Sequence, residues 1–99
     1  MTDLVKTVDV ETAKQWLSAS EAVLIDVREA DEYTAKSVPG SILYPLSTFY
    51  PNEVPFEHGK KVIFICRSGA RSARACFFFN KEHPEIDTYN LEGGILAWD

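Results

Sequence analysis

One short segment carries the residue types best suited to chemistry: Cys66-Arg67-Ser68-Gly69-Ala70-Arg71-Ser72. It follows the apolar run at residues 62–65, which is typical of a strand, and precedes a stretch with helical periodicity. A cysteine between the end of a strand and the N-terminus of a helix lies among free backbone N–H groups, which together with the helix dipole favour negative charge. These groups would lower the pKa of the Cys66 thiol and make its sulfur a nucleophile.

The other side chains of the segment suit an anion. Arg67 and Arg71 add positive charge, and a guanidinium can bind an oxyanion through two parallel hydrogen bonds. Gly69 lets the backbone bend sharply and approach a ligand closely. Two hydroxyl donors, Ser68 and Ser72, complete the set. The segment therefore predicts a loop that holds an anion above the sulfur.

The alternative for this cysteine is a buried, inert side chain at the end of a strand, with the arginines in surface ion pairs, because free cysteines are often buried. The glycine, the two arginines and the position before a helix together favour the functional interpretation. That interpretation requires a sulfur that is ionised near neutral pH and reachable from solvent.

The bulk composition bounds the class of protein. Its 99 residues fit one domain, here taken as residues 1–99, and the 45% hydrophobic content suffices for one core and excludes the disordered class. No apolar run approaches the roughly 20 residues of a membrane helix. The first six residues lack the basic and apolar segments of a secretory signal, so we expect a cytoplasmic location and no membrane partner.

Charge is distributed unevenly along the chain. The formal net charge of −5 argues against nucleic acid as a partner. Between Lys60 and Lys81 there are six basic residues and no acidic one, whereas all fifteen acidic residues lie elsewhere. A cationic patch of this kind would attract small anions and acidic protein surfaces. The alternative is a basic helix face that keeps the protein in solution.

Two cysteines, Cys66 and Cys76, cannot form a disulfide framework, which favours free thiols and a reducing compartment. The two histidines, His58 and His83, have no zinc-ligand spacing to the cysteines and are expected at the surface. We therefore expect no metal. Cys76 falls inside a predicted helix and is expected in the core, with a role as a resolving thiol for Cys66 as the alternative.

The elements around the segment alternate between strand and helix. Strand patterns cover residues 8–10, 23–25, 42–44, 62–65 and 87–91, and helix patterns cover residues 11–17, 29–35, 69–81 and a last turn through 98. Residues 45–59, with three prolines, predict a loop with one helical turn. This order predicts an α/β fold with a mostly parallel central sheet and helices on both faces. In such sheets ligands bind beyond the carboxyl ends of the strands, which is where residue 66 lies.

Three further sets of side chains have structural or supporting interpretations. Asp26 and Arg28 follow a predicted strand and suggest an ion pair or turn cap with Glu32, or else a supporting role that shapes the active loop. The run of three phenylalanines at residues 77–79 predicts a helix buried over more than one face, with a strand as the alternative. Two tryptophans, Trp16 and Trp98, are expected to pack on the core.

Residues 66–72 resemble the active-site loop of the rhodanese family. Three more segments match signatures of that family in the family's order: Leu24-Ile25-Asp26-Val27-Arg28-Glu29 followed by Glu32-Tyr33, Val38-Pro39-Gly40-Ser41-Ile42, and Leu91-Glu92-Gly93-Gly94-Ile95 followed by Trp98. The ordered set spans roughly residues 5–98. The resemblance implies a single rhodanese-like domain that acts as a sulfurtransferase of the thiosulfate:cyanide type.

The resemblance also implies a mechanism. Cys66 would take the outer sulfur of an anionic donor, thiosulfate or a persulfide, and pass it from a cysteine persulfide to a thiol or to cyanide. Backbone N–H groups would stabilise the persulfide, and the arginines would bind the donor's oxyanion. The implied substrate-binding residues are Arg67, Ser68, Gly69, Ala70 and Arg71, and the supporting residues are Asp26, Arg28 and Ser72. No metal or organic cofactor is implied, and an acidic sulfur-carrier protein is a further candidate partner.

Two alternatives stay open. The first is a binding or regulatory module that keeps the fold without turnover. The second is a phosphatase or arsenate reductase, whose related loops place five residues between the cysteine and an arginine. Here Arg71 comes five positions after Cys66, so the loop is one residue short. A smaller cradle suits a sulfur atom better than a tetrahedral oxyanion.

Overall fold

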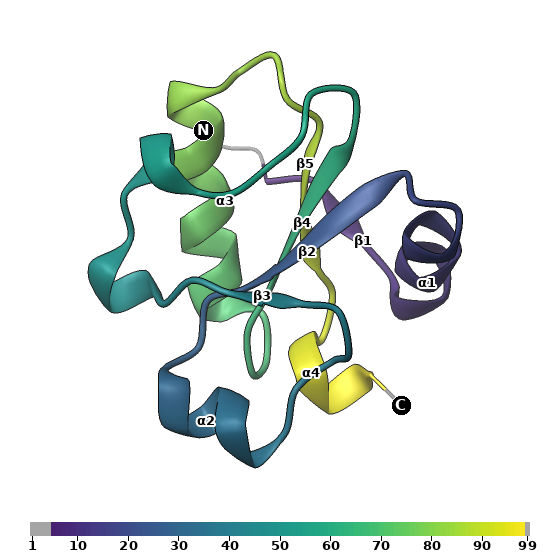
Figure 1. Cartoon of the computed structure of the whole chain (residues 1–99), viewed down its shortest axis with the longest axis vertical. Coiled ribbons are helices and arrows are strands. Elements are labelled where there is room, and N and C mark those ends of the chain that lie inside the picture. Colours follow the sequence, from purple (N-terminus) through teal and green to yellow (C-terminus); the bar gives the residue numbers. More distant parts are fainter. Residues whose placement is uncertain (1–4, 99) are drawn as a thin grey trace.

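The centre of the molecule is a sheet of five strands, all parallel, in the order β1-β5-β4-β2-β3 (Figure 1). The computed structural model describes residues 5–98. The strands are β1 (Thr7–Val8), β2 (Ala22–Asp26), β3 (Ile42–Leu43), β4 (Lys61–Ile65) and β5 (Thr88–Leu91). The predicted mostly parallel α/β sheet is confirmed.

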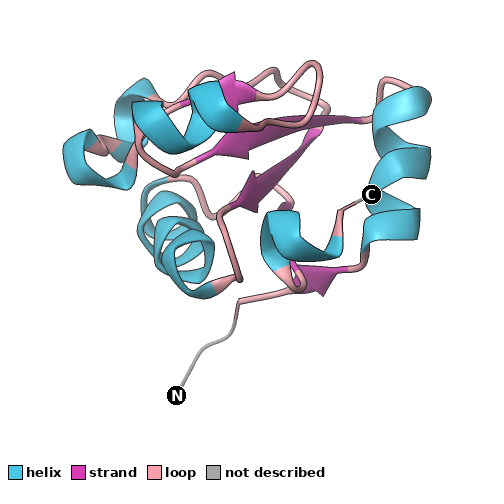
Figure 2. Cartoon of the chain, turned by 90° about the horizontal axis from the view of Figure 1, so that it is seen from below, coloured by secondary structure: helices cyan, strands magenta, loops and turns pink. Residues whose placement is uncertain are grey.

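Helices cover both faces of the sheet, as predicted. They are α1 (Val10–Ser18), α2 (Ala30–Ala35), α3 (Ala70–Glu82) and α4 (Gly94–Ala97), with two 3-10 turns, η1 (Leu46–Thr48) and η2 (Pro51–Glu53), in the proline-rich segment. Figure 2 shows the strands lying between helices on opposite sides. In Figure 1, α2, α4 and the loop between β4 and α3 all lie at one end of the sheet.

Successive side chains of β4 point to opposite faces of the sheet and contribute to two hydrophobic clusters, one on each face. Val62 and Phe64 face α3, where they pack with Ala75 and Phe79. The intervening Ile63 and Ile65 face the side of α1 and α4. Because both faces are covered, the strand reads as a continuous apolar run, and the same alternation directs the next side chain, Cys66, toward α3.

The predicted strand at residues 8–10 is wrong at its end. Strand β1 stops at Val8, and α1 already begins at Val10. The reason is the carboxylate of Asp9, which accepts a hydrogen bond of 3.2 Å from the backbone N–H of Thr12 and so caps the helix.

The phenylalanine run is helical, but the prediction that it is buried over more than one face is wrong. Phe79 is fully buried, whereas Phe77 and Phe78 are 52% and 40% exposed. Successive residues of a helix point about 100° apart, so only one of the three can face the sheet.

The remaining core predictions have mixed outcomes. Cys76 is buried, and Trp16 and Trp98 pack against the core on the α1 side, as expected. His58 is exposed, but the surface position expected for His83 is wrong, because its half-buried ring packs 4.7 Å from that of Phe79. Among residues 5–98 no helix is long and apolar enough to cross a membrane.

Candidate functional site

The loop between β4 and α3 is held in place by the first turn of α4. The backbone N–H of Ile95 donates to the carbonyl of Cys66 at 2.8 Å, and that of Leu96 donates to the carbonyl of Arg67 at 3.2 Å. Gly94 makes this approach possible, since a Cβ there would lie 2.3 Å from the Arg67 carbonyl oxygen. Gly94 of the C-terminal signature therefore allows α4 to contact the loop, a role that the sequence pattern alone did not indicate.

The sulfur of Cys66 accepts hydrogen bonds from its own loop. The backbone N–H of Gly69 donates to Sγ at 3.1 Å, and the hydroxyl of Ser72 lies 3.3 Å away. Gly69 adopts a φ of +115°, a backbone conformation that residues with a side chain rarely adopt. This conformation explains why the position is a glycine. Burial raises the pKa of the Cys66 thiol, but the hydrogen bonds from Ser72, Gly69 and Ser68 outweigh that effect, and the pKa lies below its ordinary value.

Access to this sulfur differs from expectation. Cys66 is only 1% exposed, so the expectation of a sulfur open to solvent is wrong in this conformation. Arg67 and Ser68 beside it are exposed. The nucleophile candidate thus lies beneath an exposed loop.

Asn90 at the end of β5 is a site residue that sequence reasoning missed. Its Nδ2 donates to the carbonyl of Gly69 at 3.1 Å, and its Oδ1 accepts a 2.5 Å hydrogen bond from the hydroxyl of Ser72. Because Ser72 has one hydroxyl proton, Asn90, the carbonyl of Gly69 at 3.2 Å and the Cys66 sulfur compete for it. A donation to Sγ favours the thiolate, whereas a donation to Asn90 leaves the Ser72 oxygen as an acceptor for the thiol. A polar residue at the carboxyl end of a buried strand was the available signal.

Arg71 is engaged by a carboxylate. Its Nη1 and Nη2 lie 2.8 and 2.9 Å from Oε1 and Oε2 of Glu32. The Arg71 guanidinium and the backbone N–H of Glu29 hold the pKa of Glu32 at about 2. Arg67, by contrast, is exposed and has no ion pair among the described residues. Of the two arginines expected to bind an anion, only Arg67 is unpaired in this structure.

The predicted ion pair between Asp26 and Arg28 is present and deeply buried. Arg28 Nη2 lies 2.8 Å from Asp26 Oδ2, and the two side chains are 5% and 0% exposed. The same guanidinium also donates to the carbonyls of Lys36 at 2.6 Å and Glu32 at 3.4 Å. The pair thus binds the middle and the C-terminal end of α2, the helix that presents the Glu32 carboxylate to Arg71.

The structure brings only part of the predicted site to the sulfur. Gly69, Ser72 and the backbone of Ser68 surround Sγ. Ala70 is exposed and forms the first turn of α3. Asp26 and Arg28 lie away from these contacts, and Arg28 binds the carbonyls of Glu32 and Lys36 instead. No group of His, Cys, Asp and Glu side chains in the described part of the chain could hold a metal ion.

Known proteins resemble this chain in sequence and in fold. The model of the rhodanese-like domain matches residues 9–99. The putative sulfurtransferase YtwF of Bacillus subtilis is 30% identical over 96 residues, covering 96% of this chain and 91% of the relative. A sulfurtransferase of Allochromatium vinosum is 34% identical over 99 residues, covering 96% and 89%. The crystal structure of a rhodanese-like domain protein from Staphylococcus aureus superposes with a TM-score of 0.80 at 29% identity, covering 96% and 92%. The chain therefore belongs to the rhodanese-like sulfurtransferase family.

Proposed function

We propose that this protein transfers sulfane sulfur through a persulfide on Cys66. The observation that carries the proposal is the pair of contacts from Gly69 N–H and Ser72 Oγ to Sγ, ahead of the N-terminus of α3. Together they stabilise negative charge on sulfur, and negative charge is what both the thiolate and the persulfide carry.

The reaction has two balanced steps. The Cys66 thiolate attacks the outer sulfur of thiosulfate, a new S–S bond forms, and sulfite leaves with the electron pair of the bond that breaks. Cyanide or an acceptor thiolate then attacks the outer sulfur of the persulfide, which releases thiocyanate or a new persulfide and restores the Cys66 thiolate. Neither step requires a metal or an organic cofactor.

The proposed roles of the neighbouring residues follow from their contacts. The backbone N–H groups of the loop and the Ser72 hydroxyl stabilise the persulfide. Arg67, exposed and unpaired within the described chain, binds the incoming oxyanion. Arg71 contributes a positive charge that is partly neutralised by Glu32.

The acceptor and the compartment follow from charge and from the free thiols. We propose a thiol, cyanide or an acidic sulfur-carrier protein as acceptor, because the basic stretch at residues 60–81 favours anionic partners. Two unpaired cysteines suit a reducing compartment such as the cytoplasm.

The test is the mass of the intact protein after treatment with thiosulfate. We expect a gain of one sulfur atom that disappears in Cys66→Ser and persists in Cys76→Ser, the matched control that removes the other thiol. If neither thiosulfate nor any other sulfane donor adds sulfur to the folded wild-type protein, the proposal is wrong.

The burial of Cys66 favours a second candidate, a binding module without turnover. Its sulfur would then resist both persulfidation and alkylation in the folded protein, and react with iodoacetamide only after denaturation. Measurable alkylation under native conditions, together with sulfur uptake, would exclude that candidate.

A further inference from the structure

A pocket between α3 and the edge of the sheet lies outside the sulfur site described above. It has a volume of about 300 Å³, at the lower end of the range for small-ligand pockets. Helix α3 packs on β4 and β5, whereas β1 lies beyond β5 as the edge strand. The space, here called the edge pocket, is lined by Val5, Lys6 and Thr88 on the sheet side and by α3 on the other, and by none of residues 66–72.

The helical wall of the edge pocket consists of neighbouring side chains of α3. Cys76, Phe77, Asn80 and Lys81 stand at helix positions i, i+1, i+4 and i+5 and therefore share one side of the helix. The amide of Asn80 donates to the carbonyl of Ile86 at 3.2 Å. This hydrogen bond ties the α3 wall to the turn before β5, so the two sides of the pocket are held together.

The interior of the edge pocket is apolar and carries no charge. Cys76 is buried, and burial raises the pKa of its thiol, so this side chain stays neutral. Phe77 is half-exposed, although it lines the same pocket. An apolar ligand group would cover aromatic surface that the protein leaves in water, and an aromatic group would also gain an edge-to-face or stacked contact with the ring.

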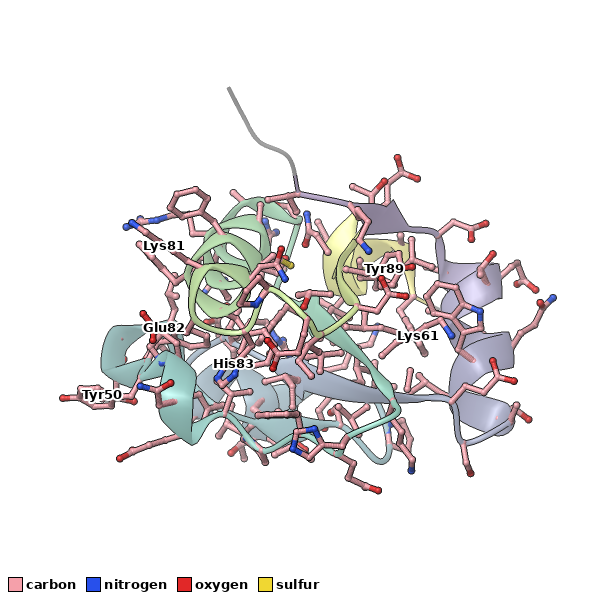
Figure 3. All side chains as sticks on the ribbon, turned by 90° about the horizontal axis from the view of Figure 1, so that it is seen from above. Tyr50, Lys61, Lys81, Glu82, His83 and Tyr89 are labelled. Atoms are coloured by element: carbon pink, nitrogen blue, oxygen red, sulfur yellow. The ribbon has the colours of Figure 1, made fainter. Side chains whose placement is uncertain are left out.

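Charge at the rim of the edge pocket is of one sign. Of the described residues that line it, two are lysines and none is acidic, in a chain with fifteen acidic and ten basic residues. Lys6 forms an ion pair with Asp87. Lys81, which extends outward from α3 in Figure 3, has no ion pair within the part of the chain that the structure describes. The rim therefore offers one ammonium group to an anion.

The ammonium group and the aromatic surface lie next to each other. Nζ of Lys81 is 5.8 Å from the centre of the Phe77 ring. An anion that binds Lys81 thus brings any apolar group attached to it onto the same ring. A second copy of the chain would bring the same lysines to this surface, so charge favours a small anionic ligand over self-association.

We propose that the edge pocket is a binding site for small aromatic carboxylates. The aromatic group packs against Phe77 and the neutral Cys76, and the carboxylate accepts a charge-assisted hydrogen bond from Lys81. Lys6, on the sheet side, adds positive charge that Asp87 partly neutralises. Binding is reversible and involves no covalent step. The proposal goes beyond sulfur transfer and does not depend on it.

The experiment measures the Kd of naphthalene-2-carboxylate for the full chain by calorimetry. Naphthalene-2-carboxamide, which has the same ring system without the charge, is the matched ligand. We expect the carboxylate to bind about fivefold more tightly than the amide, and Lys81→Gln to abolish that preference. Lys14→Gln makes the same charge change on α1, outside the pocket, and should leave the preference unchanged.

The aromatic contact is tested by a second pair of variants. Phe77→Ala should raise the Kd of both ligands about three- to tenfold, because it removes the exposed ring of the pocket. Phe78→Ala is the matched control, since it removes the next exposed phenylalanine of α3, which does not line the pocket. Circular dichroism of each variant verifies folding.

Three results would overturn the proposal. The first is equal binding of the carboxylate and the amide to the wild-type protein, or no binding of either. The second is carboxylate binding that Arg67→Gln removes and Lys81→Gln does not, which would place the ligand at the sulfur loop. The third is a wild-type dimer in sedimentation that Phe77→Ala splits, which would assign the pocket to a second copy.

The two proposals of this article can fail separately. Carboxylate binding should persist in Cys66→Ser, which cannot form the persulfide. A protein that takes up no sulfur but binds the carboxylate through Lys81 would contradict the proposed function alone. A protein that takes up sulfur but does not distinguish the carboxylate from the amide would contradict the edge pocket alone.

Discussion

Arg71 and Glu32, 39 positions apart in the chain, join α3 to α2 through two parallel hydrogen bonds of 2.8 and 2.9 Å. The pair lies at the end of the sheet where the sulfur loop lies. The two side chains are 36% and 30% exposed, so solvent screens their attraction. The effect of the pair is therefore expected in ligand binding more than in stability.

We expect Glu32→Gln to lower the KM for thiosulfate about two- to fivefold, because it removes a negative charge near an anionic donor and frees Arg71. Steady-state kinetics at low ionic strength measures this. Glu82→Gln, which makes the same charge change at the far end of α3 (Figure 3), is the control. Equal effects of the two variants would mean that only net charge matters.

Ser72→Ala should make Cys66 less reactive. The thiolate is the reactive form, so the alkylation rate rises with pH and levels off above the pKa, which lies below that of an ordinary thiol. Loss of the Ser72 hydroxyl removes a hydrogen bond that lowers the pKa of Cys66, moves the profile to higher pH, and slows alkylation at neutral pH about three- to tenfold. A profile that does not move would show that Ser72 gives its proton elsewhere.

Asn90→Ala should move the same profile in the opposite direction. Without Oδ1 of Asn90, the Ser72 hydroxyl keeps two acceptors, the carbonyl of Gly69 at 3.2 Å and the Cys66 sulfur at 3.3 Å, so its donation to the sulfur increases and favours the thiolate. The pH dependence of iodoacetamide alkylation, followed by mass spectrometry, detects this shift. Movement to higher pH would instead mean that Asn90 acts chiefly by holding the carbonyl of Gly69.

Gly94→Ala should damage both stability and activity. The new Cβ would lie 2.3 Å from the Arg67 carbonyl, so the loop must move, and overpacking of this kind costs about 1–3 kcal/mol in unfolding free energy. Gly40→Ala is matched to it, since Gly40 also has a positive φ but no atom within 4 Å of its Cβ position. Urea unfolding and sulfur uptake should separate the two variants, and equal losses would argue against a role for the loop contact.

Asp26→Asn should be the most destabilising of these substitutions. It leaves the Arg28 guanidinium buried without its counter-charge, which typically costs about 3–5 kcal/mol. Asp87→Asn breaks the surface pair with Lys6 and should cost less than about 1 kcal/mol. Urea denaturation measures both, and similar losses would mean that solvent reaches Arg28 in solution.

The central strands β2 and β4 could be predicted because both are covered on both faces and therefore contain continuous apolar runs. The run at residues 62–65 and the loop after it gave the location of the sulfur. Helix ends were less accurate, because the carboxylate of Asp9 caps a helix inside an apparently strand-like stretch.

Contacts between distant segments could not be predicted in the same way. The pairing of Arg71 with Glu32, and of Ser72 with Asn90, depends on the order of strands in the sheet. Exposure depends on which neighbours cover a side chain. A local pattern therefore gave the position of Cys66 directly after β4 but not its burial, and it overestimated the burial of Phe77 and Phe78.

The hydrogen bonds between α4 and the loop that carries Cys66 have a consequence for synthesis on the ribosome. The carbonyls of Cys66 and Arg67 accept hydrogen bonds from Ile95 and Leu96, about thirty residues later in the chain. Until that late segment has left the exit tunnel, the nascent chain carries a thiol without its mature surroundings. The hydrogen-bonded surroundings of Cys66 thus form only after residues 95 and 96 have left the tunnel, and until then this cysteine reacts as an ordinary thiol of an unfolded chain.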